Sequence, residues 1–383
     1  MSTIIRTRSP FFIRTPQETS TLLNYFQINI TITSGLSTES QICDDLYATF
    51  SLQKRPLGDE DSVTIEISEL VNDHIEQIFT GTYSDHSPKA SVWVTVATSP
   101  RQSNGAIIDG ASVTSNTYLA QEGFNLFKEG VNYTTEPNAM LSANYLQYDR
   151  NGTATIPVNV ERVTSVQWRD GSSVRETDTF SDNGNQNQKI QYSQFTNTTL
   201  INNALITHTG GTTTITLDPV EECKFPVHKI TFLNRWGALQ DLFFFKKSVE
   251  TLDSRSENFN SSIFKARSVS KSFEEGEGEG EEGNCVETIT YNQYSTTAHA
   301  KKTFNANATE SIQLNTGFVN ELMNPYFQEL LVSEYIWMTD ASNVVYPVNI
   351  KDSSFTTKTS INDRLINYTM NFERSFDFVN NIR

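Results

Sequence analysis

The chain has 383 residues, of which 37% are hydrophobic, 19% are charged and 11% are aromatic. Its net charge of −16, with only 29 Lys and Arg residues, argues against a nucleic-acid clamp, because such clamps take their affinity from clustered basic side chains. The most hydrophobic window, 241–246, is far too short to cross a bilayer as a helix, so we expect no membrane contact. Residues 1–6 lack the pattern of a secretory signal, which predicts maturation in a cytoplasm.

The composition predicts a mainly β protein of several domains. Thr, Ser, Asn, Phe and Tyr suit pleated strands and polar turns. The expected fold is several β-sandwich or small-barrel domains with one or two short helices. Domains of about 100 to 200 residues suggest an N-terminal sandwich at 1–100, a middle β-domain with long polar loops at 101–225 and a C-terminal β-domain at 226–383.

Strands dominate the first region. In Tyr25–Thr33 every second residue is apolar, so one face is buried and the other is wet. The same period of two predicts strands at 46–52, 63–67 and 92–96. At 68–78 the apolar residues recur at helical spacing behind Ser68, which predicts one short helix with a serine cap.

The middle region contains predicted strands at 153–160, 163–168 and 212–217. Between two of them lies the long polar stretch 170–188, which is expected to be a loop. Such a loop makes surface contacts or is a solvated connector, and the sequence leaves both open.

The third region begins with two apolar strands, 227–233 and 242–245, joined by a bend in which Gly237 takes a positive φ. An acidic loop of alternating Glu and Gly follows at 273–283 and is expected to be mobile and exposed. A helix is predicted at 324–333, with Asn324 as its cap and Pro325 at its first position. The remaining predicted strands are 285–294, 311–314, 335–338, 344–350, 354–359 and 365–372.

We find no pattern that predicts catalysis, a cofactor or a metal. The three widely spaced cysteines are expected to be reduced packing residues: Cys43, Cys223 and Cys285. The five histidines have no ligand spacing: His74, His86, His208, His228 and His299. Carboxylate pairs such as Asp149 with Glu161, or Asp170 with Glu176, fit a glycosidase only by chance, since 45 acidic residues are present. The acidic loop is expected to be solvated rather than to bind Ca²⁺.

Three stretches resemble a poorly characterised family of tailed-phage structural proteins common in phages of Bacteroidota. They are 118–132, 232–247 and the final seventy residues, where the resemblance includes Glu329 to Ser333 and a strand entered through Pro347. Only the middle stretch is a specific motif, and the acidic loop looks like an insertion. The resemblance implies a virion subunit of the tail, baseplate or neck, assembled in the host bacterial cytoplasm, with no catalytic residues.

Such a subunit is expected to form a ring of identical copies and to contact other virion proteins. The alternative is a β-rich adhesin or carbohydrate-binding receptor-recognition protein, in which Trp93, Trp168 or Trp236 would stack on sugar; core packing is the competing role of each. A polysaccharide depolymerase would need parallel β-helix repeats, and no fixed repeat is visible.

The hairpin of the middle stretch is the predicted interface or structural motif. Its apolar strand has large side chains on both faces, which predicts a buried junction with a neighbouring domain or another copy. The residues assigned to this motif are Asn234, Arg235, Trp236, Gly237, Phe243, Phe244 and Phe245.

Overall fold

The computed structural model describes residues 2–34, 46–57, 61–83, 89–182, 189–196, 199–261, 268–274, 284–290, 296–297, 299–358 and 365–379. The chain is mainly β, with 51% of residues in strands and 6% in helices, and no closed barrel forms among the described strands. The predicted fold class is therefore confirmed. Two compact units are present: the first contains 1–249 and 312–375, and the second contains 250–311 and 376–383. The finer boundaries at 100 and 225 stay predictions.

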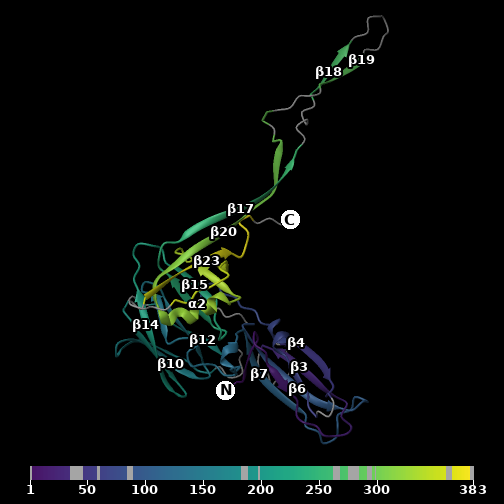
Figure 1. The fold of residues 1–383 in the computed structure, drawn as a ribbon, viewed down its shortest axis with the longest axis vertical. Helices are drawn as coiled ribbons and strands as arrows, with labels where there is room; N and C mark the ends of the chain where they lie inside the picture. Colours follow the sequence, from purple (N-terminus) through teal and green to yellow (C-terminus); the bar gives the residue numbers. More distant parts are fainter. Residues whose placement is uncertain are drawn as a thin grey trace. The chain divides into compact units, whose positions relative to one another are not determined.

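The first unit begins with a five-stranded sheet of order β1-β7-β6-β3-β4 (Figure 1). Its strands are β1 (Ile4–Arg6), β3 (Tyr25–Thr33), β4 (Leu46–Lys54), β6 (Ser91–Arg101) and β7 (Thr114–Gln121). Within this sheet β1 and β7 pair in parallel, and the other described pairs are antiparallel. Alternate residues of β3 are buried, as the period of two predicts. The small sheet of β2 (Phe12–Arg14) and β5 (Thr64–Glu66), followed by α1 (Ser68–Asn72), contributes to the same core.

Helix α1 is shorter than predicted, because it ends at Asn72 rather than near residue 78. After this point the chain runs beside the segment that precedes β6, where the Glu76 N–H donates to the Lys89 carbonyl at 3.0 Å. The predicted cap is also wrong. Ser68 lies inside the helix, and its backbone N–H and hydroxyl both donate to the Glu66 carboxylate.

A second five-stranded sheet has the order β11-β10-β13-β14-β8, and β9 pairs with β12 beside it. The strands are β8 (Tyr145–Asp149), β9 (Ala154–Asn159), β10 (Val163–Asp170), β11 (Ser173–Thr179), β12 (Ile190–Phe195), β13 (Asn203–His208) and β14 (Gly211–Val220). The expected loop at 170–188 is partly wrong, because β11 forms a hairpin with β10. All but one of the seven residues of β11 are exposed, so this strand carries no hydrophobic periodicity.

The third sheet has seven strands in the order β16-β15-β21-β22-β23-β20-β17. They are β15 (His228–Leu233), β16 (Leu239–Phe244), β17 (Val249–Asn260), β20 (Lys301–Asn320), β21 (Ile336–Thr339), β22 (Val345–Ile350) and β23 (Leu365–Arg374). The predicted strand at 354–359 is absent from the described residues 351–358. Instead Phe355 packs against Phe327 and Tyr368, with ring centroids 6.1 and 4.7 Å away.

Helix α2 (Asn324–Leu331) follows a short 3-10 turn, η4 (Glu321–Met323). The helix begins one residue earlier than predicted: Asn324 is its first residue rather than its cap, and Pro325 is its second. The side chain of Asn324 bonds elsewhere: the amide donates to the Lys358 carbonyl at 3.1 Å, and its oxygen accepts from the Tyr368 hydroxyl at 2.6 Å. The helix is thereby attached to the segment that precedes β23.

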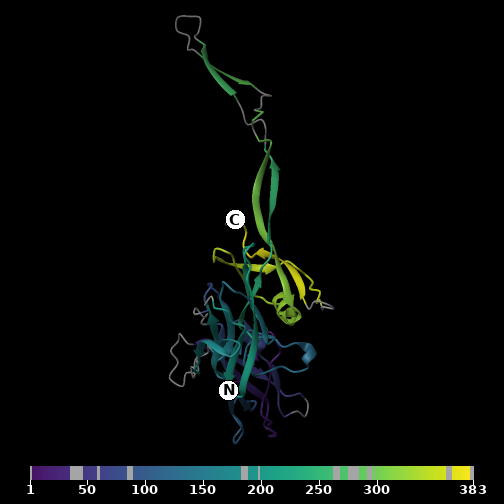
Figure 2. The same cartoon turned by 90° about the vertical axis from the view of Figure 1, so that its left-hand side faces the viewer.

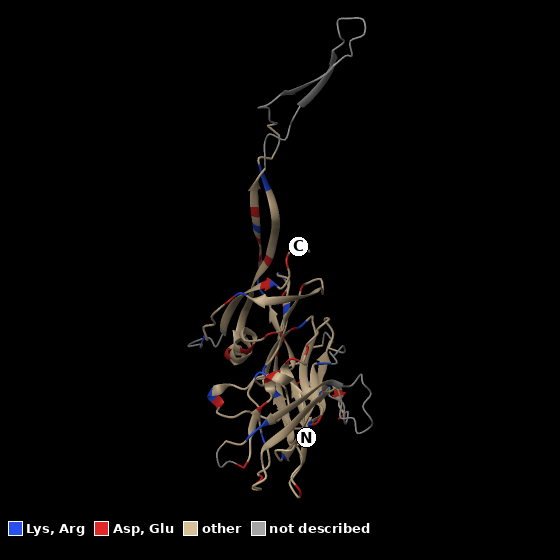
Figure 3. Cartoon of the chain, turned by 90° about the vertical axis from the view of Figure 1, so that its right-hand side faces the viewer, with Lys and Arg blue, Asp and Glu red and all other residues tan. Residues whose placement is uncertain are grey.

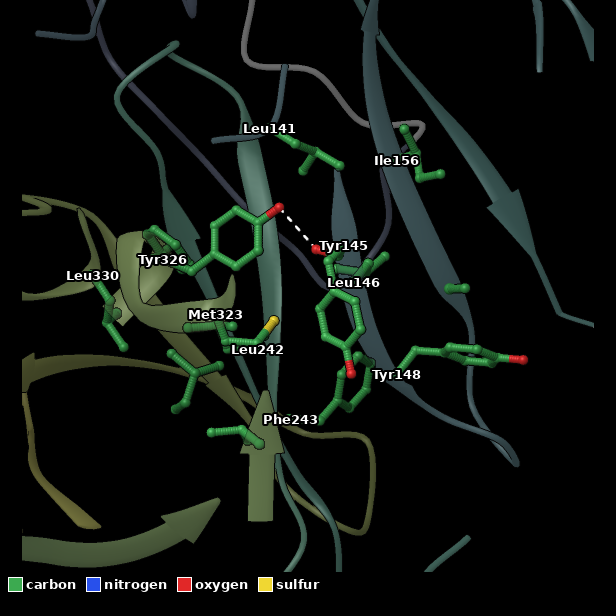
Figure 4. Close-up of a cluster of buried hydrophobic side chains, with 14 of the residues drawn as sticks. Leu141, Tyr145, Leu146, Tyr148, Ile156, Leu242, Phe243, Met323, Tyr326 and Leu330 are labelled. Carbon is green, nitrogen blue, oxygen red and sulfur yellow. Dashed lines mark hydrogen bonds between the residues drawn. The ribbon is translucent and has the colours of Figure 1, made fainter. Parts of the chain in front are cut away.

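One hydrophobic core joins the second and third sheets with α2 (Figure 4). Leu146 enters it from the second sheet, Ile156 from the neighbouring strand β9, Leu242 from β16 and Leu330 from α2. Tyr326 is buried in the same core, and its hydroxyl lies 3.0 Å from the Tyr145 carbonyl. Because these elements share one core, they behave as one packed body.

The second unit is a ribbon of antiparallel strands. The part of β17 from residue 250 onward runs beside β20 (Figure 2), and the Ser261 N–H donates to the Ala300 carbonyl at 2.8 Å. Further along the chain, β18 (Ser268–Glu274) pairs with β19 (Asn284–Thr290). The acidic residues 275–283 connect them and lie outside the described residues.

Candidate functional site

The predicted hairpin is present, and a five-residue connection, Asn234–Ala238, joins its strands. Gly237 has φ +79°, which confirms the predicted positive φ. The Asn234 side-chain oxygen accepts the backbone N–H groups of Trp236 and Ala238 at 3.0 and 3.1 Å. The side chain of Asn234, the first residue of the turn, therefore stabilises the turn by bonding to its backbone, as asparagine commonly does.

The turn lies directly against the chain that leaves β7. A Cβ placed on Gly237 would overlap the Glu122 carbonyl oxygen, and one placed on Gly123 would lie 2.7 Å from the Arg235 carbonyl oxygen. The Arg235 carbonyl also accepts the Phe124 N–H at 3.0 Å. Two glycines thus allow two backbones to touch. The sequence shows Gly123, but no local pattern connects it with Gly237.

Arg235 ties the turn to two further elements. Its terminal N–H groups donate to both carboxylate oxygens of Glu129 at 2.9 and 2.6 Å, from the short 3-10 helix η2 (Phe127–Glu129). Its backbone N–H donates to Glu329 of α2 at 3.3 Å. The hydrogen bond from Arg235 is the main reason why the pKa of Glu129 lies below its usual value.

Trp236 is half-buried, and two cations lie over its ring. The guanidinium carbons of Arg6 and Arg235 are 4.7 and 4.6 Å from the ring centroid, within the range of a cation–π contact. The Trp236 carbonyl accepts from the Gln121 side chain at 3.0 Å. Its indole N–H is buried without a hydrogen-bond partner among the described residues. The ring is therefore held by cations rather than by a hydrogen bond.

A buried ion pair lies next to the turn. Arg6 donates to Glu136 at 2.8 Å, and each side chain is only 1% exposed. Gln121 donates to the same carboxylate, and Arg162 donates to the Glu136 backbone carbonyl. Burial raises the pKa of Glu136, and Arg6 opposes this shift. This pair is a feature that sequence reasoning missed, because its members are 130 residues apart.

Two further buried glutamates lie at the same junction, and each has a perturbed pKa. Burial raises the pKa of Glu329 to about 7, against the hydrogen bonds from Ser142 and Arg235. Burial, followed by the charge of Glu334, raises the pKa of Glu122 to about 7. One carboxylate oxygen of Glu122 is buried without a partner among the described residues. Both groups are therefore poised to titrate near neutral pH.

The phenylalanine run of the motif is covered by its own chain. Phe243, Phe244 and Phe245 are 8%, 0% and 1% exposed and belong to the core shared with α2 and the second sheet. The Phe244 ring meets that of Phe372 edge-on at 5.8 Å. Another protomer is thus not needed to cover this run. A contact of the hairpin with a second copy stays a prediction.

The first unit also contains a cleft of about 730 Å³ that sequence reasoning missed. Its apolar wall includes Phe225 and Phe243, and its polar wall includes Asp149, Lys229 and Asp340. Partial burial raises the pKa of Asp149. Such a mixed lining suits a small polar ligand with an apolar face.

The other sequence candidates do not assemble into a reactive site in the described part of the chain. No group of three metal-ligating side chains occurs there. Glu161 accepts from Ser2 at 2.6 Å, and Asp170 pairs with Arg175 at 2.8 Å. Cys223 is exposed in the loop between β14 and β15, so its prediction as a packing residue is wrong.

Cys43 and His86 lie outside the described residues, and only the backbone of Cys285 is described.

Among the helices that the structure describes, none has the length and apolar character to span a membrane. A scan against protein-family models found no matching family, and a search of curated proteins found no significant relative.

Proposed function

We propose that this chain is a structural subunit of a tailed-phage virion, in the tail, baseplate or neck. It works by assembling with copies of itself in a ring and by docking to other virion proteins. The observation that carries the proposal is the turn Asn234–Gly237, which lies in the stretch that resembles this family. The polar groups of the turn bind other parts of the same unit: β7 and the chain after it, η2 and α2.

This arrangement supports a scaffolding role. The turn connects segments from the beginning, middle and end of the chain through backbone contacts, a forked ion pair and buried carboxylates. Contacts of this kind restrict relative movement of the parts that they join. A subunit that must hold a fixed shape in a particle needs such rigidity, and symmetric assembly of identical copies is the usual way to build a ring.

The positions of the tryptophan rings argue against the alternative, a sugar-binding adhesin. Trp93 and Trp168 are 3% and 0% exposed, so neither ring is open to stack on a sugar. Trp236 already has two guanidinium groups over its ring. The cleft beside Phe225 is the feature that favours the alternative, because it combines an aromatic side chain with polar groups.

The test combines assembly and location. Purified full-length chain should form closed rings in negative-stain electron microscopy, and antibodies against it should label the tail, baseplate or neck of phage particles that carry the gene. A matched glycan array should show no binding. A monomeric chain that is absent from particles, and that binds a glycan unless Phe225→Ala is introduced, would favour the adhesin.

A further inference from the structure

Strand β17 is an open edge with an unusually large exposed surface. It is the last strand of the seven-stranded sheet, and no described strand pairs with its outer side. All of its side chains are exposed, including Leu252 at 53% and Phe259 at 47%. Open edges present unpaired backbone N–H and C=O groups, and a two-stranded ribbon without a covered face is only marginally stable in water. A second strand paired along this edge would satisfy the open backbone groups and widen the ribbon.

Two backbone bonds show which side of β17 is already paired. Ser261, just after the strand, donates its N–H to the Ala300 carbonyl next to β20 at 2.8 Å, and Lys246, just before it, donates its N–H to the Asn315 carbonyl of β20 at 3.1 Å. Both bonds lie on the β20 side, so the opposite side of β17 is the open edge.

The sequence of β17 is complementary to itself about Ser254. When two copies align antiparallel with Ser254 opposite Ser254, Asp253 of each copy faces Arg255 of the other. The same alignment pairs Thr251 with Glu257 and Val249 with Phe259. Cα atoms directly opposite each other in an antiparallel pair lie about 4.5 to 5.5 Å apart, so the side chains of Asp253 and Arg255 can reach each other.

Neighbouring registers are less favourable. An axis between two residues would pair an odd-numbered residue with an even-numbered one, and their backbone groups cannot both face the partner strand in a regular twofold pair. An axis at Asp253 or at Arg255 places each charge opposite its own copy. Like charges directly opposite each other destabilise a strand pair. An axis at residue 256 pairs Arg255 with Glu257 but shortens the overlap and places Asp253 opposite Phe259. Acidic and basic residues both occur along the ribbon, as the red and blue segments of its backbone show (Figure 3).

We propose that β17 is a twofold docking edge for a second copy of this chain, paired antiparallel about Ser254. The contact is isologous, so each copy supplies Asp253 to one ion pair and Arg255 to the other. Asp253 also interacts within its own chain, and the contact between copies adds to that interaction. The inference does not depend on the proposed function, because it concerns only the pairing of two copies.

Charge reversal tests the register in the full-length chain by analytical ultracentrifugation. The wild type should contain copies paired through β17 at micromolar concentrations, as dimers or as two rings joined by this contact. Asp253→Arg and Arg255→Asp should each raise the dimer dissociation constant at least about tenfold, because like charges then face each other twice. The double variant should restore the wild-type constant. Glu257→Gln is the matched control and should leave the constant unchanged, since Glu257 faces Thr251 in this register.

Cysteine cross-linking tests the axis directly and does not depend on charge. Cα atoms directly opposite each other in an antiparallel pair lie about 4.5 to 5.5 Å apart, within disulfide range, so Ser254→Cys should give a covalent dimer under mild oxidation. Asn258→Cys places its two thiols eight residues apart, about 27 Å, and should not. A monomeric wild type, no rescue by the double variant, equal cross-linking at both positions, or preferential cross-linking through Ser256→Cys would overturn the proposal.

Discussion

Arg235 and Glu129, which are 106 residues apart in the chain, form a forked ion pair with N–O distances of 2.9 and 2.6 Å. The Arg235 side chain is 7% exposed and that of Glu129 is 25% exposed, so water screens the pair only in part. The same arginine lies over the Trp236 ring. One side chain thus fixes both the tip of the hairpin and the 3-10 helix that faces it.

We expect Arg235→Ala to lower the free energy of unfolding by about 2 to 3 kcal/mol, since hydrogen bonds between charged groups contribute more than neutral ones. Arg235→Lys should recover only part of this loss, because an ammonium group cannot make the fork. Urea unfolding followed by tryptophan fluorescence measures both. Equal stability of the lysine variant and the wild type would show that the fork contributes little.

Gly237→Ala should destabilise the protein by at least about 3 kcal/mol, because a left-handed residue costs about 1 to 2 kcal/mol and the new Cβ overlaps the Glu122 carbonyl oxygen. Gly171→Ala is the matched control. Gly171 also has a positive φ, +60°, but no heavy atom lies within 4 Å of its added Cβ. Gly171→Ala should lower the free energy of unfolding, measured by urea titration, by about 1 kcal/mol. Similar losses at both sites would contradict the close backbone contact.

Two substitutions of Trp236 distinguish the contribution of its aromatic ring to stability from that of its indole N–H. Trp236→Phe should cost less than about 1 kcal/mol, because the buried indole N–H has no partner among the described residues and an aromatic face remains for the cations. Trp236→Ala removes that face and should cost about 1 to 3 kcal/mol, less than for a fully buried ring. Thermal unfolding of the two variants checks the order. A larger loss for phenylalanine would indicate an unseen partner of the N–H.

Local patterns in the sequence predicted the elements whose faces differ in polarity. The alternation of apolar and polar residues in Tyr25–Thr33 predicted the bounds of β3, and Gly237 predicted the positive φ of the turn. Polar β11 left no such signal, because both of its faces are wet. The pairs Arg6 with Glu136 and Arg235 with Glu129 were unpredictable, since each joins elements that only the tertiary fold brings together.

Replacing the acidic residues 275–283 with Asn-Gly should leave stability nearly unchanged. Glu274 and Asn284 are paired, so a two-residue turn can join their strands. The removed stretch is only Glu and Gly, with no apolar side chain to bury. The variant should give the same yield of soluble protein and the same melting temperature as the wild type. Lower yield would mean that the acidic residues contact a basic surface.

The last prediction concerns pH. Burial raises the pKa of Glu122 from 4.5 to about 7, so the folded chain holds this proton more tightly than the unfolded chain. Its stabilising contribution is complete below about pH 4.5 and is lost as the pH rises through 7. The pKa of Glu329 is raised to about 7 in the same way, so its stabilising contribution is lost over the same pH range. Glu129 has a lowered pKa, and its contribution is lost as the pH falls below the usual value.

Glu122 and Glu329 lose their stabilising contributions at high pH, and Glu129 loses its contribution at low pH. Together they predict that the free energy of unfolding is greatest near pH 5 and declines by about 1 to 3 kcal/mol between pH 5 and pH 8. Glu122→Gln carries a neutral group at every pH, so this variant should lose part of the decline and should be more stable than the wild type at pH 8. Urea unfolding at a series of pH values measures the difference. Parallel curves for the variant and the wild type would show that Glu122 stays charged in the folded protein at neutral pH, with its carboxylate bound by a partner or by water at the junction.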